Sequence, residues 1–176
     1  MLITCIKTFI KKLPTWSGQV ILRISKPEVS GIIFVSLWIF FSRKIISWNI
    51  SSKPNADLVI QTFQKAYYSR NCPAGLMFHS DRGSQYTAFA FRKLLDELNV
   101  IQSFSKKGYP FDNACCESFF KYLKKEEVNR KTYHSLQELR LSVFEYIEGF
   151  YNAKRPHSSL GMMTPNEKEE WYWAQH

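Results

Sequence analysis

The sequence has few of the residues that build zinc sites and disulfide frameworks. Its four cysteines, at positions 5, 72, 115 and 116, form no Cys-x-x-Cys pair and have no histidine at ligand spacing. This pattern argues against both kinds of structure and is typical of a reducing compartment. The adjacent Cys115 and Cys116 are therefore interpreted as packing residues.

Long apolar runs are also missing. The most apolar stretch, Val29 to Phe41, is well short of the roughly 20 residues that a membrane-spanning helix needs. The first twelve residues, MLITCIKTFIKK, have no basic leading region and no small-residue cleavage site, which argues against a signal peptide. We therefore expect a cytoplasmic protein without a membrane partner.

Glycine, proline and acidic residues are scarce. There are seven glycines and seven prolines in 176 residues, and 45% of the residues are hydrophobic, which predicts one globular domain. The sequence has 15 acidic residues and 24 lysines and arginines, which gives a formal charge of +9. Because basic side chains displace counterions from phosphates, this excess favours nucleic acid as a partner.

Hydrophobic periodicity predicts a mixed α/β fold. We expect strands at 20–24, 32–41, 44–51, 75–79 and 100–104, and helices at 55–70, 87–99, 112–130, 135–150 and from 164 onward. Three consecutive strands predict an antiparallel meander, and the later alternation with helices predicts parallel strands. This order is expected of a ribonuclease H-like fold, a mixed sheet with flanking helices and a helical C-terminal tail.

Two carboxylates stand in settings typical of an active site. Asp81 directly follows the strand GLMFH, and Glu117 lies near the start of a helix after 35 intervening residues. At about 100° per residue, Asn113, Glu117, Lys121 and Lys124 share one stripe of that helix. The spacing suits a helix that binds a metal and DNA phosphates, but an ordinary amphipathic helix with Glu–Lys pairs would show it too.

Longer motifs resemble the catalytic domain of DDE insertion-sequence transposases, relatives of retroviral integrases. They are HSDRGSQY (79–86), GYPFDNACCESFFKYLKKE (108–126), YNAKRPHSSLGMMTP (151–165) and FSRKIISWNISSKPNADLVIQTFQKA (41–66). The resemblance runs from about Phe41 to Trp173. It implies an integrase-type catalytic core at 16–160, an irregular segment at 1–15 and a short helix within 161–176.

The resemblance also implies a metal site for DNA strand transfer. Asp81 matches the second catalytic Asp of the family and Glu117 its catalytic Glu, so both are expected to bind metal. Two Mg²⁺ or Mn²⁺ ions would activate the attacking hydroxyl and stabilise the leaving oxygen. Mg²⁺ uses few protein oxygens, so each carboxylate matters.

Two further sets of residues match the family's motifs. Those expected to contact DNA are Lys121, Lys124, Arg155 and His157. Those expected to support the site are His79, Gln85 and Asn113. The implied partners are transposon ends and target DNA at the nucleoid, and a homo-oligomer or full-length transposase.

The first acid of the family has no counterpart in this sequence. The family carries it on the first strand, where this chain has Val20 or a neighbour, and no Asp or Glu precedes Glu28. Ile39 replaces a further acid of the family. Glu28 lies in an expected turn, where a carboxylate displaced by several residues would miss the ions, and a displacement of about 1 Å can already cost on the order of a hundredfold in rate.

Two functions therefore remain open from the sequence. The first is a catalytically impaired polynucleotidyl transferase for DNA transposition and integration. The second is a degenerate transposase remnant that binds DNA or full-length transposase without cutting. We also expect sequence-specific end recognition to be absent, because the family's helix-turn-helix region would precede this sequence.

Overall fold

The sheet of the protein has five strands in the order β3-β2-β1-β4-β5. The computed structural model describes residues 16–24, 32–52, 56–72, 75–105 and 114–175. β1 pairs antiparallel with β2 and β2 with β3, whereas β1 pairs parallel with β4 and β4 with β5. The strands are β1 (Trp16–Ile24), β2 (Ile32–Ile39), β3 (Ile45–Ser51), β4 (Met77–Ser80) and β5 (Ile101–Phe104).

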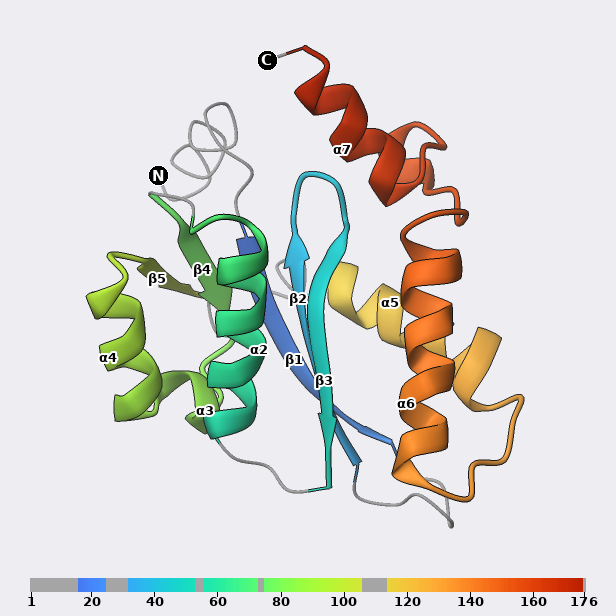
Figure 1. The fold of residues 1–176 in the computed structure, drawn as a ribbon, viewed down its shortest axis with the longest axis horizontal. Coiled ribbons are helices and arrows are strands. Elements are labelled where there is room, and N and C mark those ends of the chain that lie inside the picture. Colours follow the sequence, from blue (N-terminus) through green and yellow to red (C-terminus); the bar gives the residue numbers. More distant parts are fainter. Residues whose placement is uncertain (1–15, 25–31, 53–55, 73–74, 106–113, 176) are drawn as a thin grey trace.

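Helices cover both faces of this sheet (Figure 1). On one side lie α2 (Ala56–Ser69), α3 (Ser84–Thr87) and α4 (Phe89–Glu97). On the other side lie α5 (Ala114–Leu123) with its π-helical continuation η2 (Lys124–Val128), and α6 (Leu136–Phe144) with its π-helical continuation η3 (Glu145–Tyr151). A 3₁₀ turn, η4 (Ser158–Leu160), leads to the last helix, α7 (Pro165–Trp173).

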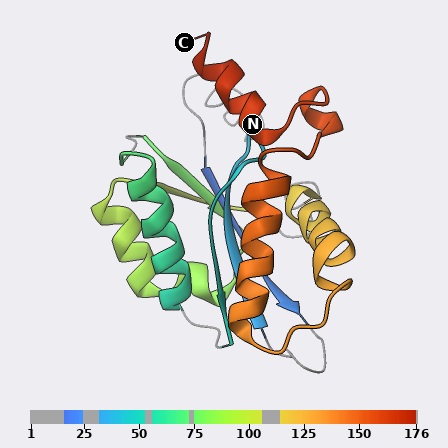
Figure 2. The same cartoon turned by 45° about the vertical axis from the view of Figure 1, so that its right-hand side comes forward.

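β2 lies between the two helical layers, and all eight of its side chains are buried. Because successive side chains of a strand point to opposite faces, the strand contributes to two cores. Phe34 and Trp38 pack with α5 and α6, whereas Val35 and Leu37 pack with α2 and α4. Figure 2 shows the sheet between these two layers from a second direction.

The C-terminal helix is attached to the hairpin that joins β2 and β3. The Glu169 carboxylate accepts from Lys44 at 2.8 Å and forms an ion pair with Arg70 at 2.8 Å. A complete capping box starts α7, in which Thr164 and Glu167 each bond the other's backbone N–H. These contacts hold the tail on the core through side chains from the β2–β3 hairpin, the residue that follows α2, and α7.

The predicted element order is confirmed, and most predicted boundaries lie within a few residues of those observed. The strand predicted at 20–24 begins earlier, at Trp16, and the helix predicted at 87–99 is preceded by the short helix α3. The helix predicted at 112–130 is described from Ala114 and changes to π-helical turns at Lys124. The segment 1–15, Glu28 and Asn113 lie outside the described residues, as do the side chains of Cys115 and Cys116. Across the described ranges, none of the helices has the length and apolar character to cross a membrane.

The core beneath α2 generates a stability prediction. Phe63 is fully buried and makes edge-on ring contacts with Phe78 and Phe91. We expect Phe63→Ala to lower the free energy of unfolding by about 3–5 kcal/mol, because it removes buried surface and leaves a cavity. Phe89→Ala, at a position that is 81% exposed, should change it by less than about 0.5 kcal/mol. Urea denaturation of both variants measures the difference, and equal effects would contradict this assignment of the core.

Candidate active site

Asp81 directly follows β4, at the end of a strand that pairs with β1. Its side chain is partly exposed, and its Oδ1 accepts a hydrogen bond from the backbone N–H of Gly83 at 2.8 Å. The Gln85 side chain lies so close over Gly83 that a Cβ at this position would overlap it. The short turn therefore orients the Asp81 carboxylate, and Gln85 covers the turn.

His79 connects β4 to the strand beside it. Its Nδ1 lies 3.1 Å from Ser103 Oγ, and its Nε2 lies 3.1 Å from Ser105 Oγ. The ring also faces Phe40 at a centroid distance of 6.1 Å. Both ring nitrogens of His79 therefore contact serines of the neighbouring segment, two residues before Asp81.

β1 lies between the elements that carry the two acids. It pairs with β4, which leads to Asp81, and it contacts α5, which carries Glu117. In the parallel pairing, Ser17 lies opposite His79. If this register continues for two residues along both strands, Gln19, a neighbour of Val20, is level with Asp81.

No carboxylate replaces the missing first acid on the strand. The sequence of β1 is WSGQVILRI, and its pairing with β2 is irregular between Gln19 and Leu22. Ile39, which stands where the resemblance implies a further acid, is buried at the end of β2. Among the described residues, no group of three or more His, Cys, Asp or Glu side chains could hold a metal ion.

Glu117 and Lys121 lie on an exposed face of α5. Both side chains are exposed, and at 100° per residue they are about 40° apart around the helix. Lys124 is only half-exposed and begins the π-helical segment η2, where the α-helical spacing no longer holds. Of the predicted stripe, Glu117 and Lys121 lie on one exposed face of the α-helix, and Lys124 follows at the C-terminal end of this face.

The tail motif packs against the β2–β3 hairpin. The buried Asn152 side chain accepts from the backbone N–H of Ile45 at 3.1 Å and donates to the carbonyl oxygen of Ile45 at 2.9 Å. The Tyr151 hydroxyl donates to the carbonyl oxygen of Arg43 at 3.2 Å. Buried amide and hydroxyl groups need such partners, so these two residues join the tail to the edge strand of the sheet.

Arg155 and His157 line a pocket beside α5. The Arg155 guanidinium lies 4.0 Å from the centre of the Tyr122 ring and 3.4 Å from the Glu126 carboxylate. The His157 ring meets the Tyr151 ring edge-on at 4.9 Å. The two predicted DNA-contacting residues of the tail are thus half-buried and separate from the exposed face of Glu117 and Lys121.

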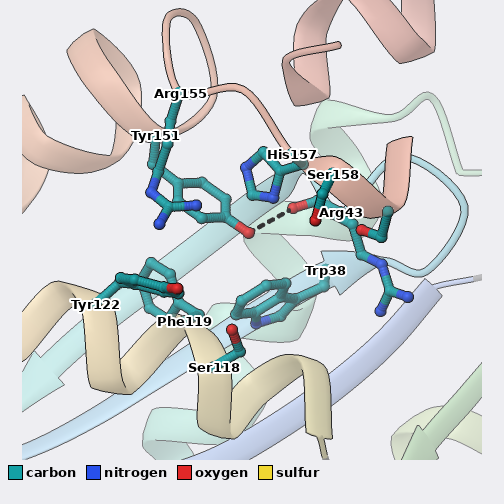
Figure 3. A pocket seen from close by; sticks show the side chains of 10 residues that line it. Trp38, Arg43, Ser118, Phe119, Tyr122, Tyr151, Arg155, His157 and Ser158 are labelled. Atoms are coloured by element: carbon teal, nitrogen blue, oxygen red, sulfur yellow. Dashed lines mark hydrogen bonds between the residues drawn. The ribbon is translucent and has the colours of Figure 1, made fainter. Parts of the chain in front are cut away.

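The pocket has a volume of about 280 Å³ and combines aromatic with polar side chains (Figure 3). It lies where α5, the β2–β3 hairpin and the tail meet. Sequence reasoning missed most of its lining, although the i, i+4 spacing of Ser118 and Tyr122 places both on one side of α5. The lining residues are Trp38, Arg43, Ser118, Phe119, Tyr122, Tyr151, Arg155, His157, Ser158 and Ser159.

Burial and nearby cations favour the neutral form of His157. Burial, together with the positive charges of Arg155 and Arg43, lowers the pKa of His157 to about 4, against an opposing effect of the Glu126 carboxylate. Burial also lowers the pKa of Arg43. For Arg155, burial lowers the pKa, but the hydrogen bond and charge of Glu126 outweigh it, so the net shift is upward.

Known proteins resemble the chain in sequence and in fold. Models of the integrase core domain family match residues 36–110 and 98–165. The transposase for insertion sequence element IS904 of Lactococcus lactis subsp. lactis (strain IL1403) is 38% identical over 146 residues, which are 82% of this chain and 58% of that protein. Transposase InsF for insertion sequence IS3A of Escherichia coli (strain K12) is 36% identical over 155 residues, or 88% of this chain and 53% of that protein. The chain thus spans little more than half the length of these transposases.

Two other similarities carry less weight for function. A protein of Lactococcus lactis subsp. lactis named ATP-dependent protease is 53% identical over 111 residues, but the match covers only 36% of that protein, so its name describes no activity of this chain. The HTLV-2 integrase catalytic core domain in complex with magnesium superposes with a TM-score of 0.64 and 13% identity, covering 89% of this chain and 97% of that one. This last similarity shows the fold.

His157 makes the stability of the protein depend on pH. In the unfolded chain a histidine titrates near 6.5, whereas in the fold the pKa is about 4. Between these values the unfolded state binds a proton that the folded state does not, so stability is full above pH 6.5 and falls as the pH drops toward 4. Between pH 7 and pH 4.5, we expect the free energy of unfolding of His157→Phe to fall by about 2 kcal/mol less than that of the original protein. Urea denaturation at both pH values measures this, with His134→Phe, at an exposed position, as the matched control. Parallel pH dependence in all three proteins would refute the assignment.

Proposed function

Because the chain belongs to the integrase core domain family, we propose that it is the catalytic core of a DDE-type insertion-sequence transposase and acts on DNA in transposition and integration. One observation carries this proposal. Asp81 follows the strand that pairs with β1, and Glu117 lies on the helix that contacts β1, so a single strand is adjacent to both acid-bearing elements. The net charge of +9 suits a phosphate-rich partner.

The two acids fit a divalent ion of the Mg²⁺ type. Mg²⁺ is commonly bound by one or two protein carboxylates together with water and substrate phosphates. Asp81 is partly exposed and uses one oxygen for the Gly83 N–H, and Glu117 is exposed, so both have oxygens available for an ion. When bound, such an ion would polarise a phosphate and lower the pKa of an attacking hydroxyl.

A second ion does not fit equally well. A two-ion site needs a further carboxylate, and β1 supplies none at Gln19 or elsewhere along the strand. We therefore propose that Asp81 and Glu117 bind one ion, and that strand transfer by this chain is impaired. The same observation supports the second function, in which the chain binds DNA or a full-length transposase without cutting.

The remaining residues then have separate tasks. Asp81 and Glu117 would bind the ion, and His79 and Gln85 would hold the turn that orients Asp81. Lys121 would contact a DNA phosphate beside Glu117, with Lys124 at the end of the same face. The partners would be transposon ends, target DNA and further transposase subunits, at the nucleoid in the cytoplasm.

Restoring the third acid tests the site. We expect little Mn²⁺-dependent strand transfer of a transposon-end duplex by the original chain, and at least a tenfold gain in Gln19→Asp, because the new carboxylate is level with Asp81. Gly18→Asp is the matched control, since Gly18 pairs regularly with Leu37 before the irregularity that follows Gln19, and adjacent positions of a regular strand face opposite sides of a sheet. Adding Asp81→Asn to Gln19→Asp should abolish the gain. Equal rates in the two single variants would contradict the proposed register, and activity that survives Asp81→Asn would contradict the proposed site.

The lysine face predicts a change in salt dependence. Each phosphate contact contributes about 0.9 to the slope of log affinity against log salt concentration. We expect Lys121→Glu with Lys124→Glu to weaken duplex binding and to reduce this slope by about 1–2. Lys65→Glu with Lys93→Glu makes the same change in net charge at exposed positions on α2 and α4. Fluorescence anisotropy at several salt concentrations measures both pairs, and identical slopes would show that the α5 face does not contact DNA.

A further inference from the structure

The pocket beside α5 is lined from the side of the helix that neighbours the Glu117 face. Ser118 and Tyr122 line the pocket, whereas Glu117 and Lys121, one residue before each of them, lie on the neighbouring exposed face. At 100° per residue the two pairs are a little more than a quarter-turn apart around the helix. Any DNA strand that lies along Glu117 and Lys121 would therefore pass beside the pocket.

The pocket is large enough for one aromatic ring system and is built to hold it. Its volume of about 280 Å³ compares with roughly 150 Å³ for an engineered protein cavity that binds benzene. Trp38, Phe119 and Tyr151 form a fixed aromatic wall, in which Trp38 meets Phe119 edge-on at 4.8 Å and Tyr151 at 5.9 Å. These three side chains are buried and packed in the core, so the wall is already formed without a ligand.

Polar groups around the aromatic wall could bind the edge of such a ring. His157 Nε2 is buried and has no hydrogen-bond partner within the described part of the chain. A neutral imidazole nitrogen can accept or donate one hydrogen bond, depending on its tautomer. The hydroxyls of Ser118, Ser158 and Ser159 belong to exposed residues and complete the rim.

We infer that this pocket receives an unpaired nucleobase from DNA held along α5. The inference rests on the proposed function, because it assumes that DNA is the partner. Enzymes that act on nucleic acid commonly move a base out of the duplex and hold it by stacking on aromatic rings and by hydrogen bonds to its edge. Tyr122 and Trp38 would contact the base, and His157 would bond its edge (Figure 3).

A lone phosphate explains the pocket less well. Arg155 already faces the Glu126 carboxylate at 3.4 Å, and the Tyr146 hydroxyl donates to the same carboxylate at 2.6 Å, so part of the positive charge is compensated. The aromatic wall offers a phosphate no hydrogen bonds. A flat ring with polar edges uses both the aromatic wall and the unpaired His157 nitrogen.

The test compares two DNA ligands that differ in one base. Both are duplexes with a short single-stranded end, and in one of them the unpaired nucleotide is replaced by an abasic linker. We expect the original chain to bind the base-bearing duplex roughly 5- to 100-fold more tightly, the range typical of stacking one base on aromatic side chains. Fluorescence anisotropy gives both dissociation constants, and a blunt duplex reports DNA binding as such.

Two variants and a matched control locate the base. Ser158→Phe should fill the pocket and bring the ratio of the affinities for the base-bearing and the abasic duplex close to one. It should leave the affinity for the blunt duplex unchanged. His157→Phe keeps the ring contact with Tyr151 but removes the buried nitrogen, and it should lower the ratio. Ser52→Phe makes the same change as Ser158→Phe at an exposed position beyond the other end of β3 and should keep the ratio of the original chain.

Each outcome decides between the pocket and the proposed function. A high ratio that falls in Ser158→Phe but not in Ser52→Phe supports the inference. A ratio near one in the original chain, with blunt duplex still bound, overturns the pocket and leaves DNA binding intact. A high ratio that survives Ser158→Phe places the base elsewhere and also overturns it. Failure to bind any of the duplexes overturns the proposed function itself.

Discussion

Burial of β2 on both faces is the constraint on which the rest of the structure depends. All eight side chains of the strand are buried, so neither face of the sheet can remain open to water at this position. Phe34 and Trp38 require cover from α5 and α6, and Val35 and Leu37 require cover from α2 and α4. The two helical layers follow from this requirement, because an apolar strand face is stable only against another apolar surface.

The same constraint positions the proposed chemistry. α5 is held against the sheet by Phe119, Phe120 and Leu123, which are buried in the core that also contains Phe34. Its opposite side presents Glu117 and Lys121 to solvent. On the other layer, packing around Phe78 fixes β4, so that Asp81 follows at the end of a buried strand. The acids are therefore carried by elements that the core holds rigidly.

The tail shows how one motif can serve both structure and binding. Asn152 bonds both backbone groups of Ile45, and Glu169 binds Lys44 and Arg70, so the C-terminal third closes over the hairpin between β2 and β3. The contact between hairpin and tail also forms part of the pocket, because Trp38 and Arg43 come from the hairpin and its strand and His157 comes from the tail. Residues that matched a DNA-contacting motif in sequence thus contribute to the walls of a cavity.

Local pattern was sufficient for much of this protein. The alternation of apolar residues and the place of Asp81 at a strand end are properties of neighbouring residues, so the sequence alone predicted the element order and the end of β4 before Asp81. The spacing of Ser135 and Glu138 is that of a capping box, but in the structure the Glu138 carboxylate accepts from the N–H of His134 rather than from that of Ser135. The continuation of α5 as a π-helix was not predicted, because hydrophobic spacing near Lys124 fits α-helical and π-helical turns alike.

Only the tertiary structure decided which distant residues meet. Counting residues left Val20 or a neighbour as the place of the missing acid, whereas the pairing of Ser17 with His79 singles out Gln19 as the neighbour nearest the level of Asp81. The register of a strand depends on hydrogen bonds to segments that are far apart in the sequence. A bulge such as that between Gln19 and Leu22 shifts the register by one residue. The pocket has the same origin. Its walls come from β2, α5 and the tail, and no spacing along the chain records that the three segments pack together.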